Sequence, residues 1–221
     1  MTAGVRLIIM GRQGAGKGTQ CQRISRHFVV PHISTGEILR AAVREGTEIG
    51  KMAKQVIEAG RLVGDEIMIE IIRERLEQDD ARTRGYILDG FPRTVAQAVA
   101  LDGIAAERPI HVVLDLDVPR DLVIQRISSR RACRDCGTNY VATGQKRDPW
   151  TCDSCGGDVV IRDDDTPESI SQRLDLYESQ TAPLLEFYGR DSRLVVIDGS
   201  KGPDEVFASL TAAIDFARKS D

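Results

Sequence analysis

The sequence predicts an α/β protein in which helices cover both faces of a parallel β-sheet. Short apolar runs alternate with segments of helical periodicity, a glycine-rich bend joins the first run to the first helix, and 221 residues suffice to bury one core. Runs that are apolar on both faces are typical of parallel strands. We expect four clear strands, at residues 5–10, 86–89, 111–117 and 194–198.

The first strand leads into a stretch suited to binding phosphate. Residues 11–20 read GRQGAGKGTQ and contain the P-loop spacing GxxxxGK. Glycines let backbone N–H groups turn toward one centre, the helix N-terminus adds partial positive charge, and Lys17 supplies a cation for phosphate oxygens. An ordinary strand-to-helix turn would explain the glycines but not the lysine. The usual hydroxyl comes one residue late, at Thr19, because Gly18 occupies its position.

The helices are located by their periodicity and by the residues that cap or end them. Thr166 and Pro167 have the N-cap and first-position pattern of a long helix. We expect helices near residues 17–28, 65–76, 166–188 and 203–218, one starting at Pro119, and short helices between the glycines of residues 34–64.

Two pairs of residues have the spacing of a capping box at the start of a helix, and one further residue is expected to cap another helix. Ser34 and Glu37 have S-x-x-E spacing, and Asp65 is expected to cap the helix that follows it. Thr94 and Gln97 have T-x-x-Q spacing. Gln97 could therefore have a purely structural role, as part of a capping box, as well as a functional one.

Four of the five cysteines have the spacing of a structural zinc site. They form two C-x2-C pairs separated by fifteen residues: Cys133, Cys136, Cys152 and Cys155. Four thiolates saturate tetrahedral zinc, so this metal would be structural. Reduced cysteines in a loose loop are the alternative. Cys21, next to the P-loop, is interpreted as a small buried apolar residue.

The composition excludes some classes of protein. The net charge of −4 gives no general basic surface for nucleic acid. No stretch approaches the roughly 20 apolar residues that cross a bilayer, and the N-terminal residues do not resemble a secretion signal. We therefore expect a cytoplasmic protein with no nucleic-acid or membrane partner.

Arginines form a further group, since guanidinium groups suit phosphate oxygens and phosphoryl transfer needs several cations around dispersed charge. Each of them could also be a solvated surface charge, and composition does not separate them from the other arginines. Six lie near loops or helix turns: Arg40, Arg93, Arg126, Arg130, Arg162 and Arg173.

The chain resembles adenylate kinases of the bacterial type with a long, cysteine-bearing lid. The resemblance runs end to end and is carried by GRQGAGKGTQ, HISTGEILRAAV, LDGFPRT, RRACRDCG and IRDDDTPESISQRL. It implies a P-loop NTPase-like core with a five-stranded parallel sheet (residues 1–33, 65–128 and 166–221), a nucleotide-monophosphate (NMP) lobe (34–64) and a zinc-containing lid (129–165). It also implies a monomer that catalyses ATP + AMP = 2 ADP with Mg²⁺ and maintains the balance of adenine nucleotides.

The resemblance assigns roles to individual positions. It places magnesium, through water, at Asp89, and an acidic pair at the lid hinge, Asp164 and Asp165. The ATP site comprises Gly14, Ala15, Gly16, Lys17, Gly18, Thr19, Arg126, Arg130 and Lys201. The AMP site comprises Thr35, Arg40, Arg61, Val63, Gly90, Arg93, Gln97, Arg162 and Arg173. The residues implied in catalysis are Lys17, Arg93, Arg126, Arg162 and Arg173.

The chain departs from the family pattern in two places, and two alternative functions stay open. Arg12 and Gln13 replace a small residue and a proline, and residues 141–150 replace a longer aromatic and Asn-Pro-Pro stretch of the lid. A related nucleoside monophosphate kinase could use another base, for example as a GTP:AMP phosphotransferase. In a different class, the four-cysteine lobe would bind nucleic acid or protein, with the P-loop as a switch; the lobe lacks a dense basic and aromatic surface.

Overall fold

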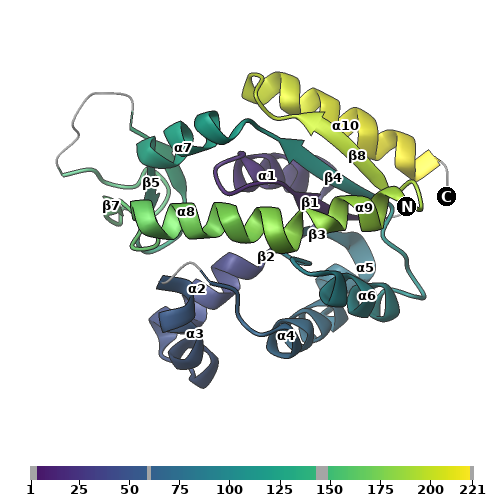
Figure 1. Cartoon of the computed structure of the whole chain (residues 1–221), viewed down its shortest axis with the longest axis horizontal. Helices are drawn as coiled ribbons and strands as arrows, with labels where there is room; N and C mark the ends of the chain where they lie inside the picture. Colours follow the sequence, from purple (N-terminus) through teal and green to yellow (C-terminus); the bar gives the residue numbers. More distant parts are fainter. Residues whose placement is uncertain (1–3, 59–60, 143–148, 220–221) are drawn as a thin grey trace.

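A computed structural model describes residues 4–58, 61–142 and 149–219. Its centre is a five-stranded parallel sheet with strand order β2-β3-β1-β4-β8, which confirms the predicted fold class (Figure 1). The strands are β1 (Val5–Met10), β2 (His32–Ser34), β3 (Gly85–Asp89), β4 (Val112–Asp117) and β8 (Leu194–Asp198).

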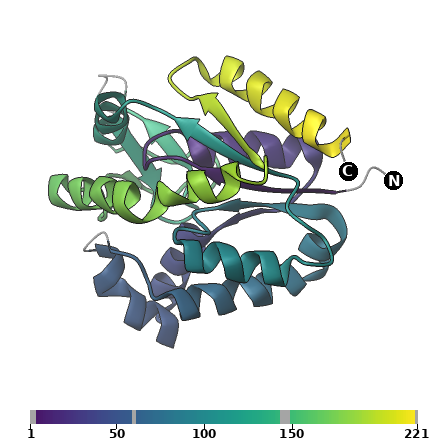
Figure 2. The ribbon, with the colours of Figure 1, turned by 45° about the vertical axis from the view of Figure 1, so that its right-hand side comes forward.

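Helices cover both faces of this sheet because successive side chains of the strands point to opposite sides. Leu7 and Ile9 of β1 pack with α1, α7, α8 and α10, whereas Ile8 and Met10 pack with α4, α6 and α9. Figure 2 shows these two helical layers, with α10 in yellow on one side and the blue and teal helices on the other. The helices are α1 (Lys17–Phe28), α4 (Asp65–Glu77), α5 (Asp79–Arg84), α6 (Val95–Ile104), α7 (Arg120–Ser129), α8 (Pro167–Leu176), α9 (Pro183–Gly189) and α10 (Pro203–Lys219).

Two smaller units extend from one end of the molecule (Figure 1). The first consists of α2 (Thr35–Glu45) and α3 (Glu48–Glu58). The second is a three-stranded antiparallel sheet of β6 (Asn139–Val141), β5 (Arg130–Cys133) and β7 (Val159–Val160). Its small core contains Cys133, Cys152 and Val159, flanked by Tyr140 and Trp150. Among the described residues, no helix has the length and apolar character needed to cross a bilayer.

The strand and helix boundaries differ from the sequence-based expectation in a few places. The strand β2 has only three residues, too short for its hydrophobic pattern to reveal it. The predicted strand at 111–117 begins at Val112, and the helix predicted to be capped by Asp65 is capped by Gly64, with Asp65 as its first residue. Asp65 instead accepts hydrogen bonds from a neighbouring helix, as described below.

The capping box predicted at Ser34 and Glu37 does not form. In the one predicted at Thr94 and Gln97, only the Thr94 side chain makes its capping bond. Ser34 is the N-cap of α2 but makes no side-chain capping bond, and Glu37 accepts a hydrogen bond from Arg40. Thr94 does cap α6, since its Oγ1 accepts from the backbone N–H of Gln97. The N-cap role of Thr166, with Pro167 following, is confirmed.

The long helix predicted from Thr166 to about residue 188 contains a π-helical turn. This turn, η1, covers Tyr177–Thr181 and joins α8 to α9. Proline has no N–H and crowds the preceding turn, so the regular hydrogen-bond pattern is interrupted before Pro183, which takes the first position of α9. The N–H of Ala182 bonds to the carbonyl of Tyr177, five residues back, which widens the turn before the proline.

Candidate functional site

A cleft of about 930 Å³ lies where the carboxyl ends of β1, β2 and β3 meet α2, α8 and the small sheet. The parallel register explains why these ends coincide: Ser34 and Ile9 both pair with Asp89. Ligands of open α/β sheets bind at this edge. Every residue assigned above to ATP, AMP or magnesium lines this one cleft.

The glycine-rich loop after β1 forms one end of the cleft. Gly11, Gly14 and Gly16 all have positive φ, and a Cβ on Gly14 would lie 2.7 Å from Ile127 Cγ1. Only glycine fits there without strain. Lys17 Nζ donates to the carbonyls of Gly11 and Arg12 at 2.7 and 2.9 Å. Burial lowers the pKa of Lys17, and the neighbouring carboxylate of Asp89 partly opposes that shift.

Arg126 and Lys201 lie beside this loop. Arg126 Nη1 donates to the carbonyls of Ala15 and Gly199, at 3.3 and 3.0 Å. It therefore connects the phosphate loop with the turn after β8 that carries Lys201. Gly18 faces the lid sheet, since a Cβ there would lie 3.9 Å from the Asn139 side chain. Asn139 was not predicted as a cleft residue, because no motif marks it.

Asp89 ends β3 on the floor of the cleft. His32 Nε2 lies 3.2 Å from Asp89 Oδ2. Burial would raise the pKa of Asp89, but the contact with His32 and the charge of Lys17 outweigh it and hold that pKa below its usual value. Asp89 is therefore an ionised carboxylate in a cleft lined with cations. The position of His32 was missed by sequence reasoning, since a lone histidine in a three-residue strand gives no signal.

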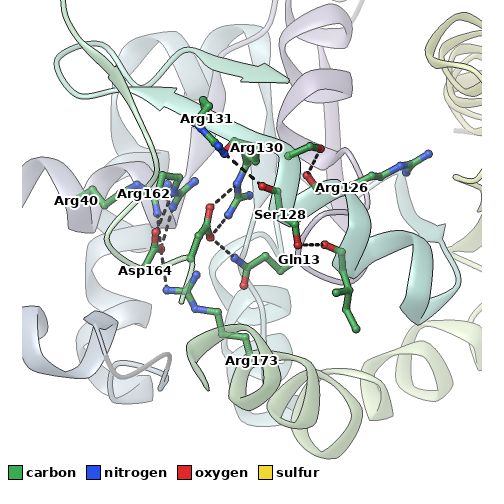
Figure 3. A network of polar contacts seen from close by, with 12 residues as sticks. Gln13, Arg40, Arg126, Ser128, Arg130, Arg131, Arg162, Asp164 and Arg173 are labelled. Carbon is green, nitrogen blue, oxygen red and sulfur yellow. Dashed lines mark hydrogen bonds and ion pairs between the residues drawn. The ribbon is translucent and has the colours of Figure 1, made fainter. Parts of the chain in front are cut away.

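Two adjacent aspartates organise the arginines between the two ends of the cleft (Figure 3). Asp164 accepts from Arg162 at 2.9 and 3.0 Å and from Arg173 at 2.7 Å, and Arg40 Nη1 lies 3.8 Å away. The Asp164 side chain is 7% exposed. Burial would raise the pKa of Asp164, but Arg162 and Arg173 hold it well below its usual range. The three arginines belong to α2, α8 and the segment after β7.

The second aspartate, Asp165, connects Arg130 of β5 to the glycine-rich loop. It accepts hydrogen bonds from two nitrogens of Arg130, one of them at 2.9 Å, and from Gln13 Nε2 at 3.0 Å. Arg12 also reaches η1, because its Nε donates to Glu178 Oε1 at 2.8 Å and its guanidinium stacks over the Tyr177 ring. These links give Arg12 and Gln13 a structural role that sequence reasoning did not find.

The opposite end of the cleft holds a buried polar cluster. Arg93 Nε donates to the carbonyl of Gly90 at 2.9 Å, and Thr35 Oγ1 donates to the same carbonyl at 2.9 Å. Gln97, 2% exposed, accepts from the backbone N–H of Arg93 and donates to Asp65 Oδ1, both at 2.7 Å. Asp65 also accepts from Thr94 and so fixes the amide of Gln97. Arg61 and Val63 line this end of the cleft as well.

The four paired cysteines lie within 4.8 Å of one another in the lid sheet. Cys133 Sγ lies 3.4 Å from Cys155 Sγ, and Cys136 Sγ lies 3.6 Å from Cys152 Sγ. Zn–S bonds of about 2.3 Å give a tetrahedral edge of about 3.8 Å, so these thiols fit zinc with little movement.

The backbone around the cysteines is built for this geometry. Gly137 and Gly156 follow the two pairs with positive φ, and their N–H groups bond back to the carbonyls of Cys133 and Cys152. The Tyr140 hydroxyl donates to Cys152 Sγ and thereby lowers the pKa of that thiol to about 6. Metals bind thiolates, so this contact favours metal binding. Residues 143–148, part of the altered lid stretch, lie outside the described residues.

Comparisons with known proteins agree with the geometry of the cleft. A family model described as Adenylate kinase matches residues 9–193. A protein named adenylate kinase from Thermoanaerobacter sp. is 45% identical over 213 residues, covering 95% of this chain and 98% of that protein. Adenylate kinases from Carboxydothermus hydrogenoformans and Clostridium perfringens are 46% identical over 213 residues and 44% identical over 209 residues. These cover 95% and 93% of this chain, and 99% and 95% of the two relatives.

Proposed function

This chain belongs to the adenylate kinase family, and from that premise we propose how its cleft performs the reversible reaction ATP + AMP = 2 ADP. One observation carries the proposal. A phosphate loop and a second polar pocket lie at the two ends of a single cleft, with Arg162 and Arg173 between them. Two nucleotides bound with their phosphates facing each other would occupy such a cleft.

The donor end would hold ATP. The backbone N–H groups of the loop that contains Gly14, Ala15 and Gly16 would receive phosphate oxygens, with Gly18 and Thr19 at the start of α1. Lys17 now donates to carbonyls of its own loop, and a bound phosphate would offer it a stronger, anionic acceptor. Arg126 and Lys201 lie where the rest of the donor nucleotide would extend.

The acceptor end would hold AMP. Arg40 and Arg93 would bind its phosphate, and Thr35 and Gly90 would border it. Gln97 would read the base, because each of its two amide atoms has one hydrogen-bonding position left after its contacts with Arg93 and Asp65. An amide fixed in this way presents one donor and one acceptor side by side.

Catalysis in this cleft would consist of positioning and charge neutralisation. A phosphate oxygen of AMP is already a nucleophile, so no general base is required. Lys17, Arg162 and Arg173 would surround the transferred phosphoryl group, where charge spreads over its oxygens. Asp164 holds Arg162 and Arg173 side by side before any substrate binds, which lowers the cost of assembling them.

Magnesium fits the donor set at the centre of the cleft. Asp89 supplies a hard carboxylate oxygen, and its lowered pKa keeps it ionised at neutral pH. It would hold the ion through water. When bound, Mg²⁺ would neutralise part of the phosphate charge.

The proposal extends to the organisation of the chain. The core would comprise residues 1–33, 65–128 and 166–221. The NMP lobe would comprise residues 34–64. The lid would comprise residues 129–165, with structural zinc bound by its four cysteines. All the residues assigned to both nucleotides come from one chain, which supports a monomer. The five cysteines are free thiols, and the four in C-x2-C pairs suit zinc. This supports a reducing compartment, and hence the cytoplasm.

A coupled assay of ADP formation tests this function. ATP with AMP is expected to give the highest kcat/KM, and replacing ATP by GTP, or AMP by UMP or CMP, is expected to lower it. Absence of ADP formation from ATP and AMP in zinc-loaded protein would overturn the proposal. Faster turnover with GTP would change the assignment of the donor site.

A further inference from the structure

A second cluster of metal-binding side chains lies beneath the phosphate loop, away from the lid. One potential ligand atom from each of Cys21, His32 and Asp89 lies within 4.8 Å of the other two. The three residues come from α1, β2 and β3, so the fold rather than a local motif brings them together. Cys21 is fully buried, whereas His32 and Asp89 line the cleft.

We propose that this cluster binds a borderline or soft divalent cation such as Zn²⁺, and that the bound ion inhibits phosphoryl transfer. Only the inhibitory effect of the bound ion rests on the proposed function. Binding itself depends on Cys21, His32 and Asp89 alone.

The ligand types determine which ion the cluster would accept. A thiolate, an imidazole and a carboxylate are ligands of zinc, with bonds of about 2.3, 2.0 and 2.1 Å. In tetrahedral geometry such ligand atoms lie about 3.3 to 3.6 Å apart, so small side-chain rotations would suffice. A hard ion such as Mg²⁺ has little affinity for sulfur or imidazole. The cluster therefore discriminates against the ion that the reaction uses.

The carboxylate of Asp89 brings a negative charge to the cluster. Burial and that charge raise the pKa of the Cys21 thiol, so its proton would leave to solvent only as the metal–sulfur bond forms. The two anionic ligands would neutralise a divalent ion that enters close to the ammonium group of Lys17. His32 already lies 3.2 Å from Asp89, so two of the three ligands are oriented toward each other. The cleft gives the ion access from the side of these two residues.

Binding would interfere with the reaction through Asp89. This carboxylate is the proposed support for magnesium, and it would be occupied by the second ion. Lys17, one helical turn before Cys21, would also face a new cation. Inhibition should therefore depend on zinc bound to this cluster and not on zinc bound by the lid cysteines.

Native mass spectrometry and equilibrium dialysis of zinc-loaded protein test the site directly. With the lid filled, wild-type protein is expected to bind one further Zn²⁺, and this second equivalent is expected to reduce turnover. Cys21→Ser and His32→Gln should each weaken the second binding roughly tenfold or more, since even outer-shell changes cost this much. Both variants should resist inhibition by zinc, measured relative to each variant's own activity with magnesium alone, and Cys21→Ser should keep that activity.

Controls separate this site from its alternatives. His27→Gln removes a histidine of α1 that lies outside the cluster and should bind the second Zn²⁺ as wild type does. Co²⁺ added to the zinc-loaded protein should give a near-ultraviolet thiolate absorption that Cys21→Ser abolishes. If Cys21→Ser does not fold, His32→Gln decides.

Three outcomes would overturn the proposal: binding of a single Zn²⁺ by wild type, an unchanged second affinity in His32→Gln, or equal inhibition of all variants. An inactive protein that still binds the second ion would contradict the proposed function but not the site.

Discussion

Gln13 Nε2 donates a 3.0 Å hydrogen bond to Asp165 Oδ1, the carboxylate that also binds Arg130. The bond joins the phosphate loop to the lid hinge across a sequence separation of 152 residues. Arg12, the adjacent residue, binds Glu178 and stacks on Tyr177. The two residues that depart from the family pattern thus tie the phosphate loop to the hinge and to the helix that follows it.

Gln13→Ala should lower stability modestly. It removes one hydrogen bond to a buried carboxylate that keeps its bonds to Arg130, a loss of about 1 to 2 kcal/mol. The melting temperature measured by calorimetry should fall by about 2 to 6 °C. Gln125→Ala, at an exposed position of α7, is the matched control and should leave it unchanged. A melting temperature equal to wild type would show that the bond contributes nothing.

Lys17→Ala should reduce kcat by at least about a hundredfold, because it removes a cation from the position where phosphoryl charge develops. Folding should change little, since Lys17 bonds only to two loop carbonyls. Steady-state kinetics and thermal unfolding measure the two effects separately. Lys219→Ala, at an exposed position near the end of α10, serves as control. Turnover near the wild-type value would remove Lys17 from the mechanism.

Gln97→Ala should raise the KM for AMP by roughly ten- to a hundredfold and leave the KM for ATP nearly unchanged. The variant also frees the N–H of Arg93 and one oxygen of Asp65. Thr94→Val, which loses the other hydrogen bond to Asp65 and the capping bond from the Gln97 N–H, controls for structural effects at this end of the cleft. If both variants raise the KM for AMP equally, base recognition by Gln97 is wrong.

Asp164→Asn should destabilise the protein by about 3 kcal/mol at pH 7, because it leaves Arg162 and Arg173 without their buried anion. The pKa of Asp164 in the folded protein lies below its unfolded value of 3.8. The contribution of the ionised Asp164 carboxylate to the free energy of unfolding is therefore complete above about pH 5. It disappears as the pH falls through the folded pKa.

Urea unfolding of wild type and Asp164→Asn between pH 7 and pH 3 measures this contribution. The difference in unfolding free energy should be constant from pH 7 to 5 and shrink below pH 4. Asp163→Asn, at the exposed neighbouring position, should show no comparable difference. A gap that widens on acidification would contradict the sign of the pKa shift.

Removing zinc from the lid should lower the melting temperature while some turnover remains. The four cysteines leave no open coordination position for chemistry, and the lid core they complete is small. Chelated protein should be assayed after excess Mg²⁺ is restored, so that only the tightly bound metal differs. Complete loss of activity at a temperature where the sheet stays folded would show that zinc does more than hold the lid.

The core strands and the zinc spacing could be predicted because each leaves a local pattern in the sequence. The strand β1 is a run of six mostly buried residues, and the two C-x2-C pairs point to one metal by their spacing alone. The strand β2 could not be found in this way, since three residues give no periodicity. Ser34 has the right spacing for a capping box, yet Glu37 pairs with Arg40 instead.

Contacts between distant segments were the main features that sequence reasoning missed. Asp65 was expected to cap its own helix, but it binds Thr94 and Gln97 of another. Gln97 is held by contacts with Arg93 and Asp65 and also lines the cleft, and its role in reading the base stays a prediction. His32 and Cys21 meet only through the order of the strands, which no local motif encodes.

The π-helical turn at residues 177–181 divides one long helix into two parts, α8 and α9, which pack into the cores on opposite faces of the sheet. The Tyr177 hydroxyl donates to Asp115 in the middle of β4 at 3.2 Å, and Arg12 covers the same ring. The α8 segment ahead of this turn carries Arg173, and its first residue follows the lid hinge directly. Ile170 and Leu174 also bury this segment in the core, so the packing of α8 against the sheet fixes the position of Arg173 in the cleft.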